Sequence, residues 1–287
     1  MSDHAAANRE ACIDDTGWHP PSAGLRLVDG FWEPATARPI SYPADGNDAC
    51  HRVEDESYWF AHRNACILEV LRLHPPPGVV YDIGGGNGFV ALALERAGHR
   101  TVLVEPGPGA RNAKARGVAR VVHATLEDAG FEDGSLDAAG AFDVVEHVEH
   151  DDAFVAVIRR LLRPGGRFYG TVPALRGLWS AADVRAGHFR RYSRASLAAL
   201  LRRGGLEVEF MSPIFSWLVL PIVLRRTLPS LAGGRAGPAV LEDDHELPAL
   251  LAPAVRRCHA WEAGRLARRS ALPFGTSLVW VAIRPPD

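Results

Sequence analysis

The feature that most constrains the fold is a short glycine-rich segment, VVYDIGGGNG, at residues 79–88. An apolar run gives way to glycines and then to the apolar stretch FVALALER, which predicts a buried strand, a tight turn and a helix. Such a turn presents backbone N–H groups and a helix N-terminus to a ligand at the edge of a sheet. The segment therefore predicts an α/β fold with a ligand site at this turn.

Short apolar runs and helical stretches alternate through the rest of the chain, which is the pattern of a parallel sheet covered by helices. The turn RPGG at 163–166 separates one of these helices from the strand after it. We expect helices at 56–73 and from near Gly88, Gly109, Val148 and Arg194. We expect a doubly wound, Rossmann-like sheet of seven strands, at residues 79–83, 101–104, 119–122, 136–142, 166–172, 206–211 and 277–283.

The chain divides into four parts: an N-terminal arm at 1–57, a core at 58–212, an insertion or lid at 213–275, and the last core strand at 276–287. The arm has little periodicity, but its aromatic residues predict that parts of it dock on an apolar surface; these are Trp18, Phe31 and Trp32. The insertion combines an apolar run, a glycine-rich turn, an acidic patch and a basic helix. Connections of this length are usually functional or disordered.

Charge and cysteine content narrow the class of protein. Lys and Arg total 32 against 34 for Asp and Glu, so a nucleic acid partner is not expected. The four cysteines form no Cys-x-x-Cys pair, which argues against a zinc site or a disulfide framework and fits a reducing cytoplasm. The longest apolar run, 214–224, contains Pro221 and is shorter than the roughly 20 residues that span a bilayer.

The glycine spacing selects among ligand classes. A dinucleotide fingerprint would need a third glycine where the chain has Phe89, and the Gly-Lys-Ser/Thr ending of a phosphate-binding P-loop is missing. Instead, Gly84, Gly86 and Gly88 follow Asp82 at every second position. This pattern resembles the first motif of class I methyltransferases that use S-adenosylmethionine. The resemblance implies that the loop packs against the methionine part of the cofactor and that Asp82 organises it.

Two further segments fit the same cofactor. Glu105 ends the second expected strand, where an acidic side chain accepts hydrogen bonds from both ribose hydroxyls, although a solvated glutamate is the alternative. The segment at 124–138, ATLEDAGFEDGSLDA, resembles the stretch that lines the adenine pocket in these methyltransferases. The resemblance implies that Thr125 and Leu126 lie beside the adenine ring. The family often has aspartate at the position of Thr125.

The fourth expected strand ends in Phe142 and Asp143, which we also expect at the cofactor. On a helix, Asp143, Glu146 and His147 would share one face. The run resembles the E-x-x-E-H segment of ubiquinone-biosynthesis O-methyltransferases, which is associated with magnesium. Three interpretations stay open: a structural link between helices, a base or orienting group for the acceptor, and a divalent metal site.

A second candidate base, His188, lies in GHFRRYS at 187–193. The segment resembles the G-H-x-R-R-Y motif of a bacterial methyltransferase group that acts on sugars, lipids or secondary metabolites. We therefore take His147 and His188 as the candidate catalytic residues. A neighbouring set would hold a polar or anionic acceptor, namely Trp179, Arg190, Arg191 and Tyr192. The alternative is that the Arg-Tyr pair only caps the sheet edge.

An aromatic and cationic segment, YWFAHRN at 58–64, precedes the first expected strand. Related methyltransferases close an N-terminal helix over the cofactor, which implies that Arg63 or His62 meets its carboxylate.

Together these segments predict a methyltransferase that uses S-adenosylmethionine, with the last strand of its sheet antiparallel. The expected acceptor is a small molecule, a sugar or a lipid-linked compound, methylated at oxygen. An NAD(P)-dependent oxidoreductase and a non-catalytic methyltransferase-like subunit are the alternatives. A weaker hypothesis places Trp217, the apolar run, Arg225 and Arg226 against a membrane surface. The sequence gives no indication of oligomeric state.

Overall fold

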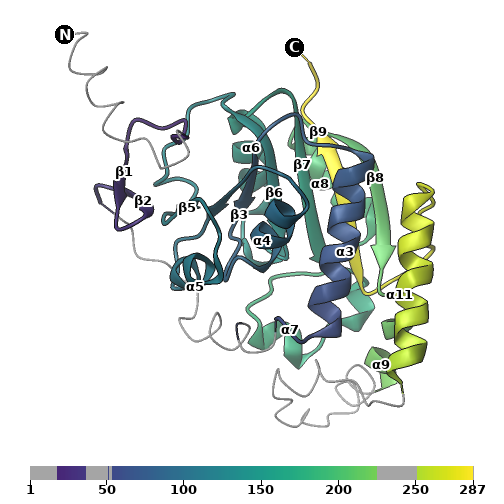
Figure 1. Ribbon diagram of the computed structural model, residues 1–287. Helices are drawn as coiled ribbons and strands as arrows, with labels where there is room; N and C mark the ends of the chain where they lie inside the picture. Colours follow the sequence, from purple (N-terminus) through teal and green to yellow (C-terminus); the bar gives the residue numbers. More distant parts are fainter. Residues whose placement is uncertain (1–17, 37–50, 52–53, 225–250, 287) are drawn as a thin grey trace, which may run out of the picture.

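The computed structural model describes residues 18–36, 51, 54–224 and 251–286. A single sheet runs through these ranges in the order β1-β2-β5-β4-β3-β6-β7-β9-β8 (Figure 1). All seven predicted strands are present, and β9 is antiparallel to both of its neighbours, as expected. They are β3 (Val80–Ile83), β4 (Thr101–Val104), β5 (Val121–Val122), β6 (Leu136–Phe142), β7 (Leu162–Pro173), β8 (Glu207–Ile214) and β9 (Ser277–Ile283).

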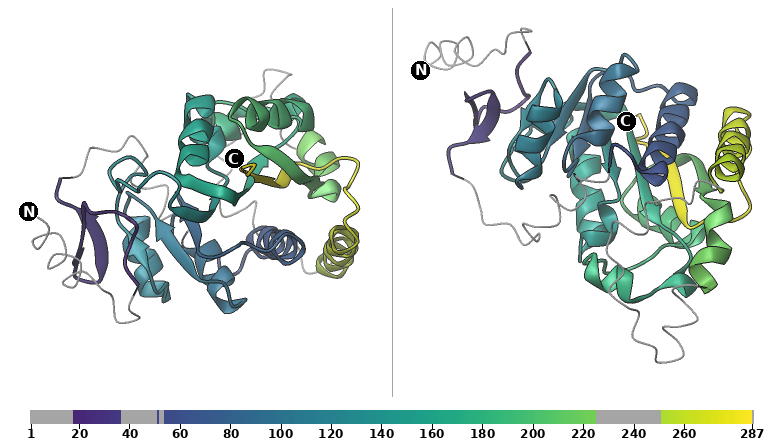
Figure 2. Two further views of the ribbon diagram at one scale, coloured as in Figure 1. Left: turned by 90° about the horizontal axis from the view of Figure 1, so that it is seen from above. Right: turned by 60° about the horizontal axis from the view of Figure 1, so that its bottom comes forward.

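Helices cover both faces of the sheet, as the left view of Figure 2 shows. One face carries α3, α4 and α11, with α11 packed beside α3, and the other carries α6 and α8. The helices are α3 (Tyr58–Leu73), α4 (Phe89–Arg96), α5 (Gly109–Arg116), α6 (Asp151–Leu161), α7 (Ala181–Arg185), α8 (Arg194–Arg203), α9 (Val219–Ile222) and α11 (Ala252–Ala267). Three single 3-10 turns are η1 (Val145–His147), η2 (Arg176–Leu178) and η3 (Ser216–Leu218).

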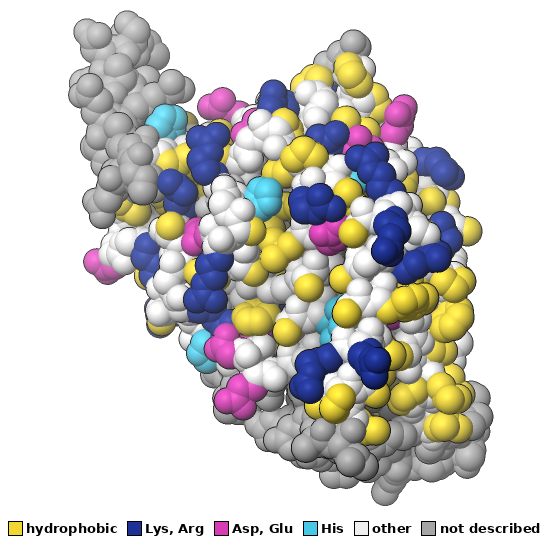
Figure 3. Space-filling view, turned by 45° about the vertical axis from the view of Figure 1, so that its right-hand side comes forward, with side chains coloured by type: hydrophobic (Ala, Val, Ile, Leu, Met, Phe, Trp, Pro, Cys, Tyr) yellow, Lys and Arg dark blue, Asp and Glu magenta, His cyan; other side chains and the backbone are white. Residues whose placement is uncertain are grey.

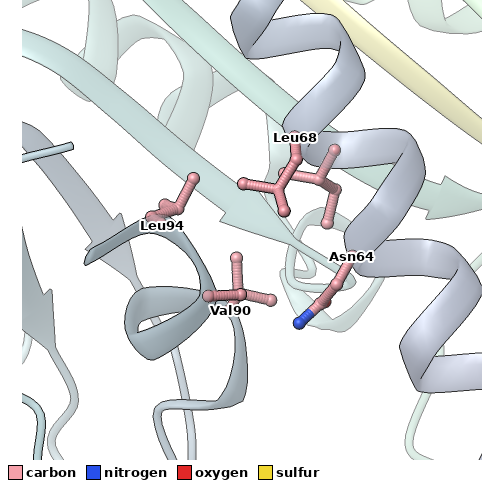
Figure 4. A pocket seen from close by; sticks show the side chains of 6 residues that line it. Asn64, Leu68, Val90 and Leu94 are labelled. Atoms are coloured by element: carbon pink, nitrogen blue, oxygen red, sulfur yellow. The ribbon is translucent and has the colours of Figure 1, made fainter. Parts of the chain in front are cut away.

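Local sequence accounts for these elements. All four residues of β3 are buried, so its sequence, VYDI, does not alternate between exposed and buried positions and carries Asp82 into the protein interior. Helix α3 begins where the Ser57 hydroxyl accepts hydrogen bonds from the N–H groups of Trp59 and Phe60, and it ends just ahead of the prolines at 75–77. It packs on α4 through apolar side chains that leave only a narrow recess beside Asn64 (Figure 4).

A hairpin in the N-terminal arm extends the sheet and was not predicted. Strands β1 (Leu25–Val28) and β2 (Phe31–Pro34) pair with each other, and Trp32 pairs in parallel with Val122 at the end of β5. Trp32 is 1% exposed, and Trp18 meets it edge-on at a ring distance of 5.9 Å. The arm therefore covers an edge that would otherwise offer unpaired backbone groups.

Several predicted bounds differ from the observed ones, and among the strands β7 and β8 differ most. Strand β7 begins at Leu162 rather than 166, so the RPGG turn lies inside it, where the pairing with β6 shifts register. Strand β8 continues to Ile214, past the boundary at 212 placed between core and insertion. Across the described ranges, no helix combines the length and apolarity that crossing a membrane requires.

Candidate active site

The carboxyl ends of the parallel strands meet at one edge of the sheet, and the predicted cofactor loop lies there. The N–H of Gly84 donates to the carbonyl of Val104 at the end of β4. Gly84, Gly86 and Gly88 all have positive φ angles, of 65°, 53° and 75°. A Cβ on Gly88 would lie 2.6 Å from that of Ala113 in α5. Glycine is therefore required at position 88 both by the left-handed backbone and by the close approach of α5.

Asp82 lies beneath this loop and is fully buried. Within the described residues, no side chain donates a hydrogen bond to its carboxylate, and the nearest backbone donor is the N–H of Ala91. Burial raises the pKa of Asp82 to about 7; the charge of Glu105 adds to the rise and Arg63 opposes it. A buried carboxylate with few hydrogen-bond donors around it fits a loop that a bound ligand completes.

Glu105 follows β4 and is 7% exposed. It accepts hydrogen bonds from the N–H groups of Gly86 at 2.9 Å and Gly107 at 2.7 Å. Burial raises its pKa, and these two hydrogen bonds oppose the rise. The carboxylate thus lies against the glycine loop, as the ribose-binding prediction requires, and it is not a solvated surface group.

The two residues predicted to lie beside the adenine follow β5. Leu126 is buried, and Thr125 is half-buried. The Thr125 hydroxyl accepts from the N–H of Asp128 at 3.0 Å, which caps a turn. The side chain of Thr125 is thus already used locally. Phe142 ends β6 with its ring over Gly140, where a Cβ would be 2.5 Å away.

Arg63 and Asp143 form an ion pair between α3 and the residue after β6. The Arg63 guanidinium also lies over the rings of Trp59 and Phe60. Asp143 accepts a second bond from the Thr171 hydroxyl at 3.0 Å. Arg63 therefore reaches the predicted site, whereas His62 does not: its ring binds Glu262 of α11 at 2.9 Å.

Asp143, Glu146 and His147 do not lie on an α-helix, which corrects the expected spacing. Asp143 has a φ of 58° in a turn, and the other two lie on the single turn η1. The potential ligand atoms that lie within 4.8 Å of one another belong instead to Glu146, His147 and His188. If a divalent ion binds here, His188 replaces Asp143 as the third ligand.

Burial dominates the electrostatics of this cluster. The Glu146 carboxyl is 1% exposed, and burial, together with the charge of Asp143, raises its pKa well above the usual range. Burial and the neighbouring His188 lower the pKa of His147 to about 4. The rings of His147 and His188 lie edge to face, 4.8 Å apart. Burial thus disfavours the charged forms of both Glu146 and His147.

Asp183 orders the segment that carries His188. Its carboxylate binds the Nδ1 of His188 at 3.0 Å and the Nε of Arg191 at 2.7 Å, and it is 1% exposed. The N–H of Phe189 donates to the carbonyl of Glu146, which ties the segment to η1. No local sequence pattern marks Asp183 for this role, because its partners follow five and eight residues later in a loop.

The other predicted acceptor residues are largely committed to protein contacts. Arg190 pairs with Asp151, and Arg191 donates to Asp183 and to the carbonyl of Ala174. The Tyr192 hydroxyl binds Asp151 at 2.7 Å. For these three residues, the contacts favour the structural alternative, in which they cap the edge of the sheet, over binding of an anionic acceptor. The remaining one, Trp179, is 38% exposed.

Sequence analysis missed a polar bridge behind the loop. The Asn87 amide donates to Glu54 at 3.2 Å and accepts from Asn112 of α5 at 2.9 Å. Glu54 also pairs with Arg116. The partners lie 25 to 62 residues apart in the sequence, so no local pattern signals them.

Comparison with known proteins agrees with this geometry. Residues 58–209, more than half of the chain, match the methyltransferase-domain family. The chain is 25% identical over 257 residues to a probable S-adenosylmethionine-dependent methyltransferase of Mycolicibacterium smegmatis, covering 88% of this chain and 99% of that protein. It is 28% identical over 161 residues to a ubiquinone biosynthesis O-methyltransferase of Xanthomonas axonopodis, covering 49% and 67%.

The fold recurs in phosphoethanolamine N-methyltransferase 2 of Haemonchus contortus bound to S-adenosylmethionine, with a TM-score of 0.54 and 16% identity over 86% of this chain and 58% of that one. The family match sets aside the oxidoreductase alternative. The chain belongs to the methyltransferase-domain family and is a class I methyltransferase that uses S-adenosylmethionine.

Proposed function

We propose that the enzyme methylates a hydroxyl oxygen of a small-molecule, sugar or lipid-linked acceptor and that His188 takes up the hydroxyl proton. The observation that carries the proposal is the bond of 3.0 Å between the buried Asp183 carboxylate and Nδ1 of His188. A carboxylate on Nδ1 holds the proton there and leaves Nε2 as the basic nitrogen. Asp183 is thus a positioning residue for the base.

His147 is suited to a different role. Its lowered pKa keeps the ring neutral at pH 7 and makes it a weak base. It would therefore orient the acceptor by hydrogen bonding, while His188, with its carboxylate partner, carries the proton. Gly187, the residue before His188, lies close to the His147 ring: a Cβ built on Gly187 would be 3.8 Å from Nδ1 of His147. The two histidines therefore belong to one cluster.

The surroundings favour an acceptor with an apolar part. Trp179, Val184 and Phe189 are 38%, 63% and 51% exposed, and all three lie in the segment that carries His188. Arg190 and Arg191 already have carboxylate partners, which gives less support to a strongly anionic acceptor. An apolar hydroxyl compound fits these side chains better than a free phosphate or sulfate ester.

Bound S-adenosylmethionine would supply the methyl group on a positively charged sulfur. As the O–CH3 bond forms and the S–CH3 bond breaks, the hydroxyl proton passes to Nε2 of His188. The positive charge then lies on an imidazolium whose Nδ1 is 3.0 Å from Asp183. The chain's own residues thus provide alignment, a base and a counter-charge.

The test is to assay a panel of hydroxyl compounds with labelled methyl donor and to identify the methylated atom by NMR. Once an acceptor is found, His188→Asn should lower kcat about 100- to 10,000-fold while the affinity for S-adenosylhomocysteine stays unchanged. His150→Asn, an exposed histidine near the same turn, is the matched control. An unchanged kcat in His188→Asn, or methylation at nitrogen or sulfur, would refute the proposal.

Chelation separates this proposal from the metal alternative, which the approach of Glu146, His147 and His188 supports. With His188 as base, treatment with EDTA leaves the activity intact. Loss of activity that Mg²⁺ restores would assign the cluster to a divalent ion instead.

A further inference from the structure

The outward face of α11 differs in composition from the rest of the described surface. Val255, Glu262 and Leu266 turn inward and are buried. Arg257, Trp261 and Arg268 follow one another at spacings of four and seven residues, which places them on one side of the helix. Trp261 is 53% exposed, and both arginines are exposed. A tryptophan thus stands between two cations on the solvent side.

The charge of this face is of one sign. Arg256 and Arg269 are exposed beside the other two arginines. The one acidic residue of α11, Glu262, is 0% exposed, and its carboxylate binds His62 and Ser216 inside the protein. Figure 3 shows several Lys and Arg side chains on this side of the molecule. An anion that approached α11 would meet no exposed carboxylate on this helix.

Apolar side chains continue the surface at the end of α11 next to α9. Leu220, Leu224 and Leu251 are 65%, 55% and 51% exposed, and Figure 3 shows hydrophobic side chains toward the lower right of this view. Phe274 is 51% exposed, and the adjoining Gly275 lies against the backbone of Ile214, just before η3. Large apolar side chains exposed together mark an interaction surface.

Helix α8 provides an internal contrast on the other face of the sheet. Arg202 and Arg203 are also exposed at its end, but none of the large exposed hydrophobic side chains of the described chain lies on α8. Arginines on a solvated helix therefore do not by themselves produce the combination found on α11.

We propose that the surface formed by α9 and the outward face of α11 binds an anionic phospholipid bilayer. The arginines would meet lipid phosphates, Trp261 would lie at the level of the headgroups, and the leucines would enter the apolar boundary. Nucleic acid would leave the leucines without a partner. Trp217, which the sequence suggested for this role, instead packs against Tyr58 and His259, with ring distances of 5.7 and 5.6 Å.

The position of the surface suits an enzyme whose acceptor is in the membrane. Strand β8 ends at Ile214, at the same sheet edge as the cofactor loop, and η3 and α9 follow directly. The leucine end of the surface therefore lies on the active-site side of the molecule, as Figure 1 shows. The binding itself does not depend on the proposed O-methylation.

The test is co-sedimentation of the full chain with lipid vesicles. Wild type should pellet with phosphatidylcholine vesicles that contain about one third phosphatidylglycerol, and about 0.5 M NaCl should release it. The double variant Arg257→Gln/Arg268→Gln removes two positive charges and should bind the vesicles about fivefold more weakly for each arginine removed. Trp261→Ala should weaken it without changing the salt dependence. The matched control, Arg202→Gln/Arg203→Gln, should bind as wild type does.

Affinity for S-adenosylhomocysteine, unchanged in every variant, verifies that each one is folded. The proposal fails if wild type does not pellet, if it pellets equally with pure phosphatidylcholine, or if the α11 and α8 variants lose the same amount of binding. Displacement of the vesicles by RNA that depends on the same two arginines would assign the face to nucleic acid and would also overturn it.

Discussion

Gly88 illustrates what a single residue contributes to the cofactor loop. It has a positive φ, and it also lies where a Cβ would be 2.6 Å from Ala113 and 2.8 Å from Val118. Gly98 has a positive φ of 90° too, but it ends a helix with nothing within 4 Å. Conformation alone therefore does not distinguish a ligand loop from an ordinary turn. Gly88 differs from Gly98 in the close approach of a neighbouring helix, α5.

This pair of glycines gives a matched prediction. Gly88→Ala should lower the free energy of unfolding by about 2–5 kcal/mol, because left-handed backbone strain adds to overpacking against α5. Gly98→Ala should lower it by about 1–2 kcal/mol, since only the backbone strain remains. Urea unfolding measures both, and equal losses would contradict the role of the contact.

Asp82 predicts a pH dependence. Its pKa rises from an unfolded value near 3.8 to about 7 in the folded protein, so the folded state binds the proton more tightly. Its contribution to stability is therefore complete below about pH 4 and is lost as the pH rises toward about 7. Asp82→Asn should remove this slope and gain stability relative to wild type by up to about 4 kcal/mol at neutral pH.

Unfolding of both proteins between pH 4 and 8 measures the effect. Parallel stability curves for wild type and Asp82→Asn would show that the carboxyl titrates normally in the folded protein.

At the scale of elements, α3 and α11 are joined by a buried polar contact. The Glu262 carboxylate accepts hydrogen bonds from the N–H groups of Phe215 and Ser216, from the Ser216 hydroxyl and from His62. These bonds hold the pKa of Glu262 below its usual value despite burial. One side chain thus connects α11, η3 and α3.

Glu262→Ala should destabilise the protein by about 3–5 kcal/mol, because it leaves several buried donors without an acceptor. Hydrogen exchange should show the α11 amides losing protection before those of β3. Glu69→Gln, which removes a surface partner of Arg72, should leave unfolding unchanged. Equal exchange at α11 in wild type and Glu262→Ala would contradict the contact's role.

The elements show what local sequence predicts and where it stops. Strands β4, β6 and β9 have the predicted bounds because each is a mainly apolar run bounded by turn or polar residues. The hairpin β1–β2 escaped prediction because its burial pattern does not alternate cleanly and its stability comes from the edge of β5. His62 and Glu262 are 200 residues apart in the sequence, so no local sequence pattern predicts their contact.

At the scale of the whole molecule, segments distant in the chain close around the cofactor loop. Glu54 comes from the segment before α3, Asn112 and Arg116 from α5, and Asn87 from the loop itself. The ion pair between Arg63 and Asp143 also connects α3 to the end of β6. The motifs at 82–88 and at Glu105 were predictable because they are local, whereas this enclosure is a product of the tertiary fold. Cofactor binding and closure of α3 over the loop should therefore be coupled.

Asn87→Ala tests this coupling. Without the hydrogen bonds to Glu54 and Asn112, a smaller fraction of the molecules has the loop at 82–88 in the conformation that binds the cofactor. The Kd for S-adenosylhomocysteine should therefore rise roughly tenfold. At a fixed saturating concentration, the stabilisation by the ligand should fall by about 1.4 kcal/mol. Thermal unfolding over a series of ligand concentrations measures the shift, with Arg72→Gln at the exposed end of α3 as control. If Asn87→Ala lowers the stability of the ligand-free protein but leaves the ligand-dependent shift intact, the bridge supports the fold alone and is not coupled to binding.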